Sequence, residues 1–543
     1  MLRRTVWRIF PAASIAACAA VAEAQTVAVT PSQLPPVTVT SPAQAPPKRA
    51  RPSQRPRHAA AGGHRPAALP PSPPNSPNDG ITAGAATIPA ANLQPAAASE
   101  RQISGEQLNA RPVSRVGEVL EAVPGLIVTQ HSGEGKANQY FLRGFNLDHG
   151  TDLAISVDGM PVNMLTHGHG QGYADINFLI PELIQSVDVR KGPYYADKGD
   201  FASAGAVDIN YLDRLSKNIV ELTAGSFGYQ RAMAAGSTKV GDGTLLAAFE
   251  ANKYNGPWDV PDDVRKLNGV LRYSQGTATD GFSLTAMAYS NGWNSTDQVA
   301  QRAIDQGLIG RYGSLDPTDG GTSSRFSLSG NWAQSSDYGQ TKLNAYVIRS
   351  SLQLYNDFTY FLDDPVNGDQ FSQTDRRTVY GFDASHAADI RIAGIDTQAR
   401  VGVQTRYDDI NVGLFKTAQR EILSTVRNDQ VQEGSVALWA DTTARWTDWL
   451  RTTVGIREDY FAGHVLSDTP QNSGNAQAAM TSPKAGIVLG PWSKTEFYGN
   501  AGFGLHSNDI RGATITVDPN DKVTPLERVP LLVRSKGAEF GDR

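Results

Sequence analysis

Alternation of apolar and small polar side chains runs through residues 215–543, and it limits that region to strands. Phe282 and Leu284, for example, alternate with Ser283 and Thr285. The same alternation recurs at 220–224, 326–332, 343–347 and 499–505. Successive side chains of a strand point to opposite faces, so these segments predict strands with one apolar and one polar face. Strands of this kind joined by Asn/Asp/Gly-rich loops are typical of a transmembrane β-barrel, although a soluble sandwich shows a similar pattern.

Residues 1–24 have the features of a secretory signal peptide. A basic start precedes an apolar stretch over 9–21, and Ala22-Glu23-Ala24 is an A-x-A cleavage site. The only cysteine, Cys18, lies inside this segment and ends a lipobox-like sequence, so an ordinary and a lipoprotein signal peptide remain alternatives. Cleavage after Ala24 leaves a mature chain that needs neither disulfides nor thiolate metal sites.

Residues 25–99 form a Pro/Ala-rich segment that is predicted to be a disordered periplasmic linker. Fourteen of the 32 prolines fall between Gln25 and Gly80, and such a composition cannot bury a core. Within it, Val37, Thr38, Val39 and Thr40 are all β-branched and lie between prolines. They are either a chance tetrapeptide or a short strand that adds to the sheet edge of a partner protein.

The charge distribution argues against nucleic acid as a partner. The net charge is −5 overall. Residues 1–24 carry a net +2 and residues 25–99 a net +5, which leaves −12 for residues 100–543. Binding to phosphates requires a cationic surface, and the main body of the chain is acidic.

The pattern of apolar segments and turns in residues 100–214 predicts a small mixed α+β domain. Apolar residues at helical spacing predict a helix over 113–123 that Pro124-Gly125 ends. Strands are predicted at 126–128, 140–142, 153–157 and 184–189.

Five segments of this domain, in order, resemble the plug of TonB-dependent outer-membrane receptors. They are Val119–Leu126 (VLEAVPGL), Leu142–Phe145 (LRGF), Val157–Val162 (VDGMPV), Ile184–Pro193 (IQSVDVRKGP) and Ser203–Ile209 (SAGAVDI). The resemblance implies a mainly β fold: a plug domain at 100–214 inside an antiparallel transmembrane β-barrel that has 22 strands in the family. Residues 215–543 suffice for about 15 strands at roughly 22 residues per strand and connection. The barrel is therefore expected to be incomplete, by C-terminal truncation.

The resemblance also implies a plug–barrel lock, in which buried cations of the plug pair with barrel glutamates. Arg143 fits that role, and Glu539 is a candidate partner, although an ordinary strand glutamate is the alternative. The second cation is Lys191, where the family usually has arginine. Lysine lacks the bidentate fork of arginine, so this second contact is expected to be weaker.

In the same family context, residues 37–40 resemble a TonB box. The implied partners are TonB with ExbB and ExbD, the outer-membrane lipid and the barrel assembly machinery. The implied location is the cell outer membrane, with the N-terminal segment in the periplasm, and the implied state is a monomer.

Candidate ligand residues fall in three predicted plug loops, which in the family form apices that face the outside. Imidazole and carboxylate groups can bind Zn, Cu, Ni or Fe, or hydrogen-bond an organic chelate. The candidates are His131, Glu134, Asp148, His149, His167 and His169. We expect no tightly bound cofactor; a metal or metal chelate would be the transported ligand. Polar loop histidines that only contact solvent are the alternative.

The sequence contains no G-x-S-x-G, P-loop or H-E-x-x-H motif, so an enzyme is not predicted. The predicted function is TonB-dependent active import of a scarce ligand, such as a ferric siderophore. The alternative is a non-transporting surface receptor or adhesin, or an inactive remnant of a truncated transporter.

Overall fold

The computed structural model describes residues 100–130 and 133–543. The predicted signal peptide, the linker at 25–99, the TonB-box-like segment 37–40 and His131 lie outside the described residues and stay predictions. In the part of the chain that is described, no helix is long and apolar enough to cross a membrane.

The N-terminal domain is built from two small sheets. Its elements are β1 (Glu100–Ser104), α1 (Gly105–Asn109), η1 (Val116–Ala122), β2 (Leu126–Thr129), β3 (Gln139–Leu142), β4 (Phe145–Asn146), β5 (Leu153–Val157), β6 (Met160–Pro161), η2 (Pro181–Leu183), β7 (Ile184–Lys191) and β8 (Gly205–Tyr211). One sheet has the order β1-β7-β8-β5-β6 and the other β2-β3-β4. The pair β5–β8 is parallel and the other strand pairs are antiparallel. The four predicted strands are confirmed as β2, β3, β5 and β7.

The predicted helix at 113–123 is shorter and more tightly wound than expected. It is the 3₁₀ helix η1, which is followed by Pro124 and by Gly125 at φ +80°. A proline cannot continue the helix, and glycine adopts a left-handed φ without a Cβ clash. The buried side chains Val119 and Leu120 still face the domain core, as the spacing predicts.

The C-terminal region is one antiparallel sheet of 14 strands, each hydrogen-bonded to its neighbours in sequence. The strands are β9 (Ile219–Ala224), β10 (Gln230–Val240), β11 (Gly243–Tyr254), β12 (Val264–Gly276), β13 (Gly281–Asn294), β14 (Gly320–Ser336), β15 (Gly339–Asn356), β16 (Phe371–Ile392), β17 (Ile395–Ala418), β18 (Glu421–Thr447), β19 (Leu450–Ser467), β20 (Gly474–Trp492), β21 (Thr495–Ser507) and β22 (Leu532–Asp542). Four short helices lie in connections: η3 (Ser226–Gly228), α2 (Gln301–Asp305), η4 (Pro470–Asn472) and α3 (Ile510–Thr514).

The strand faces follow the alternation in the sequence. On β13, Phe282 and Leu284 are 43% and 49% exposed, whereas Ser283, Thr285 and Met287 are buried. The apolar face therefore points outward and the small polar face points inward, toward the N-terminal domain. This is the arrangement of a membrane barrel with a polar interior, not that of a soluble sandwich with an apolar interior.

The longest connections lie at one end of the sheet, although the turn 419–420 at that end is short. Short turns join strands at 241–242, 277–280, 337–338, 393–394, 448–449 and 493–494. Long connections at the other end include 255–263, 295–319, 357–370 and 508–531. In outer-membrane barrels the short turns lie on the periplasmic side and the long loops on the outer side.

The 14 strands agree with the expectation of about 15, and they do not close into a ring. β9 and β22 are the edge strands, and they do not pair with each other among the described residues. On β9, Val220 and Leu222 are 79% and 81% exposed.

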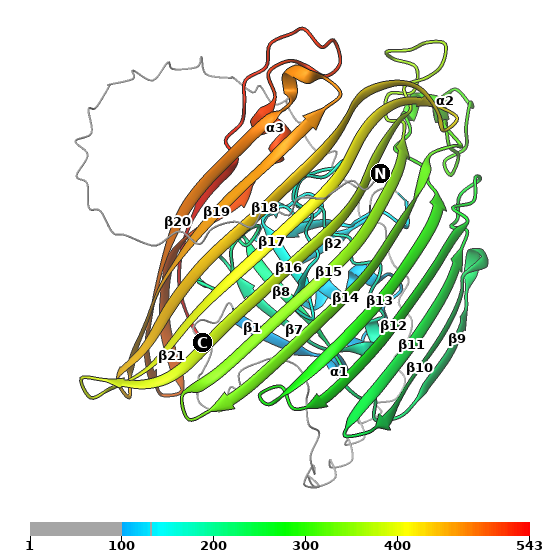
Figure 1. Ribbon diagram of the computed structural model, residues 1–543. Coiled ribbons are helices and arrows are strands. Elements are labelled where there is room, and N and C mark those ends of the chain that lie inside the picture. The colour runs from blue at the N-terminus through cyan, green and yellow to red at the C-terminus, as the bar shows by residue number, and fades with distance from the viewer. Residues whose placement is uncertain (1–99, 131–132) are drawn as a thin grey trace, which may run out of the picture. The chain divides into compact units, whose positions relative to one another are not determined.

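The N-terminal domain lies within the curve of the barrel sheet, where its strands are drawn in blue and cyan (Figure 1). One apolar cluster joins its core, for example Leu153 and Leu179, with inward side chains of the barrel such as Met233, Leu246 and Ile348. The domain is thus a plug whose core continues into the barrel wall.

Candidate functional site

Three of the four predicted apex histidines come together around one tyrosine of the plug. The His149 and His169 ring centroids lie 4.7 Å apart. The His167 ring stacks on Tyr173 at 4.2 Å with an interplanar angle of 6°. The predicted loop that carries His149 and the predicted loop that carries His167, His169 and Tyr173 therefore form one aromatic cluster.

These histidines are less accessible than an outward-facing apex implies. His149 and His167 are both buried at 4% exposure. The reason is the barrel wall: Gln373 on β16 lies over the loop, with its Oε1 2.7 Å from His169 Nδ1 and its Nε2 donating to the Gly168 carbonyl (2.9 Å). We expected histidines exposed at the outer apex of the plug, but His149 and His167 are buried.

The imidazole nitrogens of the cluster have partners within the protein. His149 Nδ1 lies 2.9 Å from the Ala137 carbonyl, and His167 Nδ1 accepts the backbone N–H of His169 at 3.1 Å. Burial lowers the pKa of His167 well below its ordinary value, and nearby Arg377 lowers it further. Both effects keep the His167 ring neutral at physiological pH.

The two predicted carboxylates separate. Asp148 Oδ1 lies 3.7 Å from His149 Nε2, and its side chain is more than half exposed. Glu134 instead pairs with Arg115 at 3.2 Å. Among the described residues, no three His, Cys, Asp or Glu side chains are arranged to hold a metal ion. Ligand or metal contact by these residues stays a prediction.

Arg143 and Glu539 meet, although 396 positions separate them in the sequence. Arg143 Nη2 lies 2.9 Å from Glu539 Oε2, and the two side chains are 41% and 11% exposed. Glu539 also accepts a hydrogen bond from Asn500 of β21 (3.2 Å). Lys191 Nζ donates to the Pro124 carbonyl within the plug. Glu539 also acts on Lys191 electrostatically, and the role of Lys191 in the lock stays a prediction.

A second set of plug–barrel contacts, which the sequence reasoning missed, lies along the plug segment 193–203. Lys484 donates to the Pro193 carbonyl at 2.9 Å, and Ser507 donates through its backbone N–H and its hydroxyl to Asp200, both at 2.7 Å. Glycines of β21 and β22 make room for Pro193: a Cβ on Gly504 or Gly537 would lie within 2.8 Å of the proline ring. The close approach of the plug depends on these glycines.

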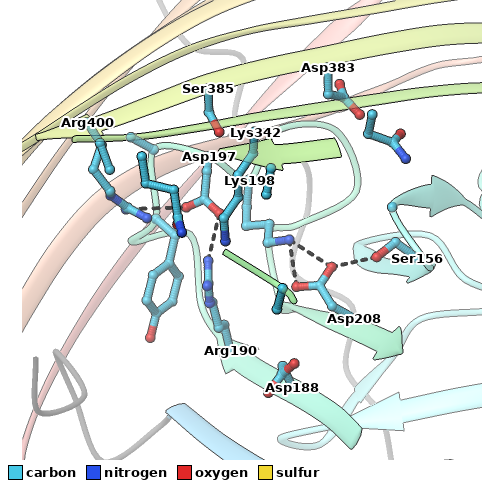
Figure 2. Close-up of a pocket in the computed structure, with 18 of the residues that line it drawn as sticks. Ser156, Asp188, Arg190, Asp197, Lys198, Asp208, Lys342, Asp383, Ser385 and Arg400 are labelled. Carbon is cyan, nitrogen blue, oxygen red and sulfur yellow. Dashed lines mark hydrogen bonds and ion pairs between the residues drawn. The ribbon is translucent and has the colours of Figure 1, made fainter. Parts of the chain in front are cut away.

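Within that segment, a chain of ion pairs crosses from the plug to the barrel (Figure 2). Asp197 binds Arg190 of β7 at 2.7 Å and lies 3.7 Å from Arg400 of β17, which in turn binds Asp441 of β18 at 2.6 Å. Next to it, Lys198 binds Asp208 at 2.7 Å. Burial raises the pKa of the Asp197 carboxyl, but Arg190 and Arg400 more than offset this, so its pKa lies well below the ordinary value. Asp197 is therefore ionised at neutral pH.

These side chains line a cavity of about 740 Å³ between the plug and the barrel. It is bounded by plug residues from 100–102 and 188–198 and by residues near the short turn at 277–280. Cations and carboxylates both line it, and they include Arg190, Lys198, Arg272, Lys342, Asp188 and Asp383. The cavity lies toward the end of the barrel that carries the short turns.

The inner face of the barrel pairs many of its arginines by a local rule. In five places an arginine has an aspartate two residues away, which puts both on one strand face or on one turn of a loop. The pairs are Asp375–Arg377, Arg406–Asp408, Arg427–Asp429, Arg457–Asp459 and Asp509–Arg511. The spacing R-x-D or D-x-R is readable in the sequence and is the signal that would have found them.

Some of these pairs also hold the plug. Arg377, which is fully buried, donates to the Thr166 carbonyl of the plug. Glu433 of β18 accepts from the Thr166 backbone N–H and hydroxyl, both at 3.0 Å. Arg406 donates to the Asn163 carbonyl at 2.8 Å. The loop that carries His167 and His169 is therefore fastened to the barrel on several sides.

Comparison with known proteins agrees with this architecture. Residues 92–206 match the TonB-dependent Receptor Plug Domain family. Over 173 residues the chain is 28% identical to the vitamin B12 transporter BtuB of Vibrio vulnificus (strain CMCP6), a match that covers 32% of this chain and 27% of that protein.

Two solved structures share the fold. The unliganded ferric citrate transporter FecA superposes with a TM-score of 0.67 at 14% identity, covering 82% of this chain and 67% of that chain. The copper transporter OprC gives a TM-score of 0.62 at 16% identity, covering 82% and 70%. The plug match shows that residues 92–206 are a TonB-dependent receptor plug domain, and the solved structures show that the chain shares the plug-in-barrel fold of TonB-dependent transporters.

Proposed function

We propose that this protein imports a scarce ligand across the outer membrane by TonB-dependent active transport, and that the ligand is a metal or metal chelate. The observation that carries the proposal is the way the plug is held. It lies within the barrel sheet, and the described contacts between the two are non-covalent: ion pairs, hydrogen bonds and apolar packing.

A plug held in this way blocks the lumen yet can be displaced by force. Individual ion pairs and hydrogen bonds contribute only about 1 kcal/mol each, so a pull on the N-terminal segment could break them in sequence. Residues 37–40, with TonB, ExbB and ExbD, are the proposed point and source of that pull. The proposed location is the outer membrane, with the N-terminal segment in the periplasm.

Relatives support the ligand class but not its identity. Proteins named as transporters of vitamin B12, ferric citrate and copper resemble this chain in sequence or fold. His149, His167 and His169, with Asp148, are the proposed ligand-contacting group.

The test compares uptake in cells that express the full chain, a deletion of residues 37–40, or a matched deletion of residues 43–46 in the same linker. Cells starved separately of iron, zinc, copper or nickel are supplied with the radiolabelled metal and with its common chelates. Import predicts uptake of one of them that is lost in the first deletion, is kept in the second, and stops when the proton gradient collapses. Equal uptake in all three strains would refute the proposal and favour a non-transporting surface receptor.

A further inference from the structure

The inward arginines of the barrel bind carboxylates through one particular edge. In Arg377 and Arg406, Nε and Nη2 together hold the two oxygens of an aspartate, at 2.8 and 2.6 Å and at 2.6 and 2.9 Å. Arg400 holds Asp441 through the same two nitrogens at 2.8 and 2.6 Å. This side-on fork is a preferred geometry for arginine with a planar oxyanion.

Arg325 of β14 has the same fork without an aspartate to fill it. Its residue is 5% exposed, and among the described residues neither Nε nor Nη2 has a hydrogen-bond partner. The positions two residues away, where Arg377 and Arg406 have aspartate, are Ser323 and Ser327. No described carboxylate lies within ion-pair distance of Arg325, whereas Arg231 of β10 and Arg272 of β12 pair with Glu182 and Asp158 of the plug.

The plug packs against the flat face of this guanidinium, and the fork nitrogens Nε and Nη2 at its edge are buried without a described hydrogen-bond partner. The Phe178 ring lies 4.6 Å from Arg325 Cζ, a cation–π contact that partly replaces lost hydration. The hydroxyl of Ser327, which is also buried and has no described partner, lies on the same strand face. The buried carboxylate of Asp175 attracts this guanidinium from beyond ion-pair distance, but the fork has no described acceptor. An anion there would offset the cost of burying its unpaired N–H donors.

From this geometry we propose that Arg325 and Ser327 form a binding site for an oxyanion, a carboxylate or phosphate group, between the plug and β14. The fork supplies two parallel N–H donors and Ser327 a third donor. As part of the proposed importer, the site would take an anionic group of the cargo, which makes the cargo a chelate with carboxylate or phosphate groups. That last step rests on the proposed function; anion binding itself does not.

The test is a titration of the purified full chain in detergent with inorganic phosphate or malonate, using sodium chloride at equal ionic strength as the reference. The measured quantity is the midpoint of thermal unfolding. We expect the wild type to be stabilised in a saturable way. In Arg325→Met the half-saturating concentration should rise about tenfold or more, because a bidentate contact to a charged group is lost.

Two further variants keep the result interpretable. Ser327→Asp creates the R-x-D spacing found elsewhere on the wall, so an internal carboxylate should fill the fork; this variant should be stable without anion and should not respond to it. Arg265→Met removes an exposed arginine and should respond like the wild type. The proposal is overturned if the wild type shows no response beyond chloride, or if Arg325→Met or Ser327→Asp responds as strongly as the wild type.

The preferred anion identifies the group: a stronger response to malonate assigns a carboxylate, and a stronger response to phosphate assigns a phosphate. This titration needs neither TonB nor transport. If the protein does not respond to anions but uptake depends on residues 37–40, only the anion site is rejected. Anion binding in a chain that fails the uptake test would reject only the importer.

Discussion

The two halves of the barrel wall hold the plug by a different balance of apolar and polar contacts: β10–β15 add the ion pairs Arg231–Glu182 and Arg272–Asp158 to their apolar packing. Strands β10–β15 contribute apolar side chains to the plug core, among them Met233, Leu246, Met287 and Ile348. Strands β16–β22 meet the plug mainly through charged and polar groups, and the smaller apolar cluster there has only Leu165 and Phe201 as fully buried plug members. We call these the apolar wall and the ionic wall.

The difference shows how a plug can be both stable and removable. Apolar packing is non-directional and depends on buried area, so it tolerates small shifts of the plug. Ion pairs and hydrogen bonds are directional; they are lost over about an ångström and can be replaced by water. A displacement that begins at the ionic wall would therefore meet contacts that break one at a time.

The largest expected effect comes from breaking the ionic wall at its most buried point. Arg377→Met leaves the buried Asp375 without its arginine and removes one of the two arginines that bind the buried Asp408, the other being Arg406. Removing one partner of a buried pair costs about 3–5 kcal/mol. Urea unfolding of the full chain, followed by tryptophan fluorescence, would show the loss. Adding Asp375→Asn to Arg377→Met should recover part of it; an undiminished loss in the double variant would mean that the charge pairing is not the cause.

A slightly smaller effect is expected on the apolar wall. Ile348→Ala removes a side chain that is 1% exposed and belongs to the cluster shared with the plug. Deleting such a side chain costs about 2–5 kcal/mol through lost burial and the cavity left behind. The loss, from the same urea measurement, should be equal at low and at high sodium chloride. A strong salt dependence would show that the two walls do not differ as described.

The pH dependence should distinguish two aspartates of one plug segment on the ionic wall. Burial raises the pKa of Asp200 to about 6, which its hydrogen bonds from Ser507 only partly offset, while Asp197 has a depressed pKa. Between the ordinary value of 3.8 and about 6, the folded state keeps a proton on Asp200 that the unfolded state releases. Stability due to Asp200 therefore falls as pH rises through this window.

Asp200→Asn should remove this fall, because a neutral amide cannot ionise. Asp197→Asn should act in the opposite sense: wild type loses stability relative to this variant only as pH drops below the ordinary carboxyl value. Unfolding midpoints of the wild type, Asp200→Asn and Asp197→Asn, measured from below pH 3.8 to above pH 6, would distinguish the two carboxyl groups. Parallel curves would mean that neither carboxyl is perturbed.

The smallest expected effect is at the pair that joins the plug to β22. Because Arg143 is 41% exposed, Arg143→Ala should cost less than about 1 kcal/mol, as solvent screens such a pair. Glu539→Gln should behave alike, and the double variant should cost no more than the larger single change. A loss of stability well above about 1 kcal/mol would mean that the pair stabilises the protein more than its exposure implies.

Features set by residues close together in the sequence could be predicted, and contacts between distant residues could not. The helical turn before Pro124, the plug strands and the outward face of β13 are set by neighbouring residues and by period two, and all were readable. The R-x-D pairs on the ionic wall are equally local and could have been read in the same way. The clustering of His149 with His169, and the contact of His169 with Gln373, could not, because separate plug loops and a barrel strand meet there.

The sequence by itself determined that this chain makes a plug and a set of two-faced strands, since turn residues and side-chain alternation act over a few positions. Only the tertiary structure decided which charges meet. Arg143 with Glu539, Asp197 with Arg400, and Thr166 with Glu433 lie hundreds of positions apart, and their pairing depends on how the plug sits against the wall. The same geometry decided that Arg325 has no aspartate at its fork, because a buried charge acquires its partner from whatever the fold brings near.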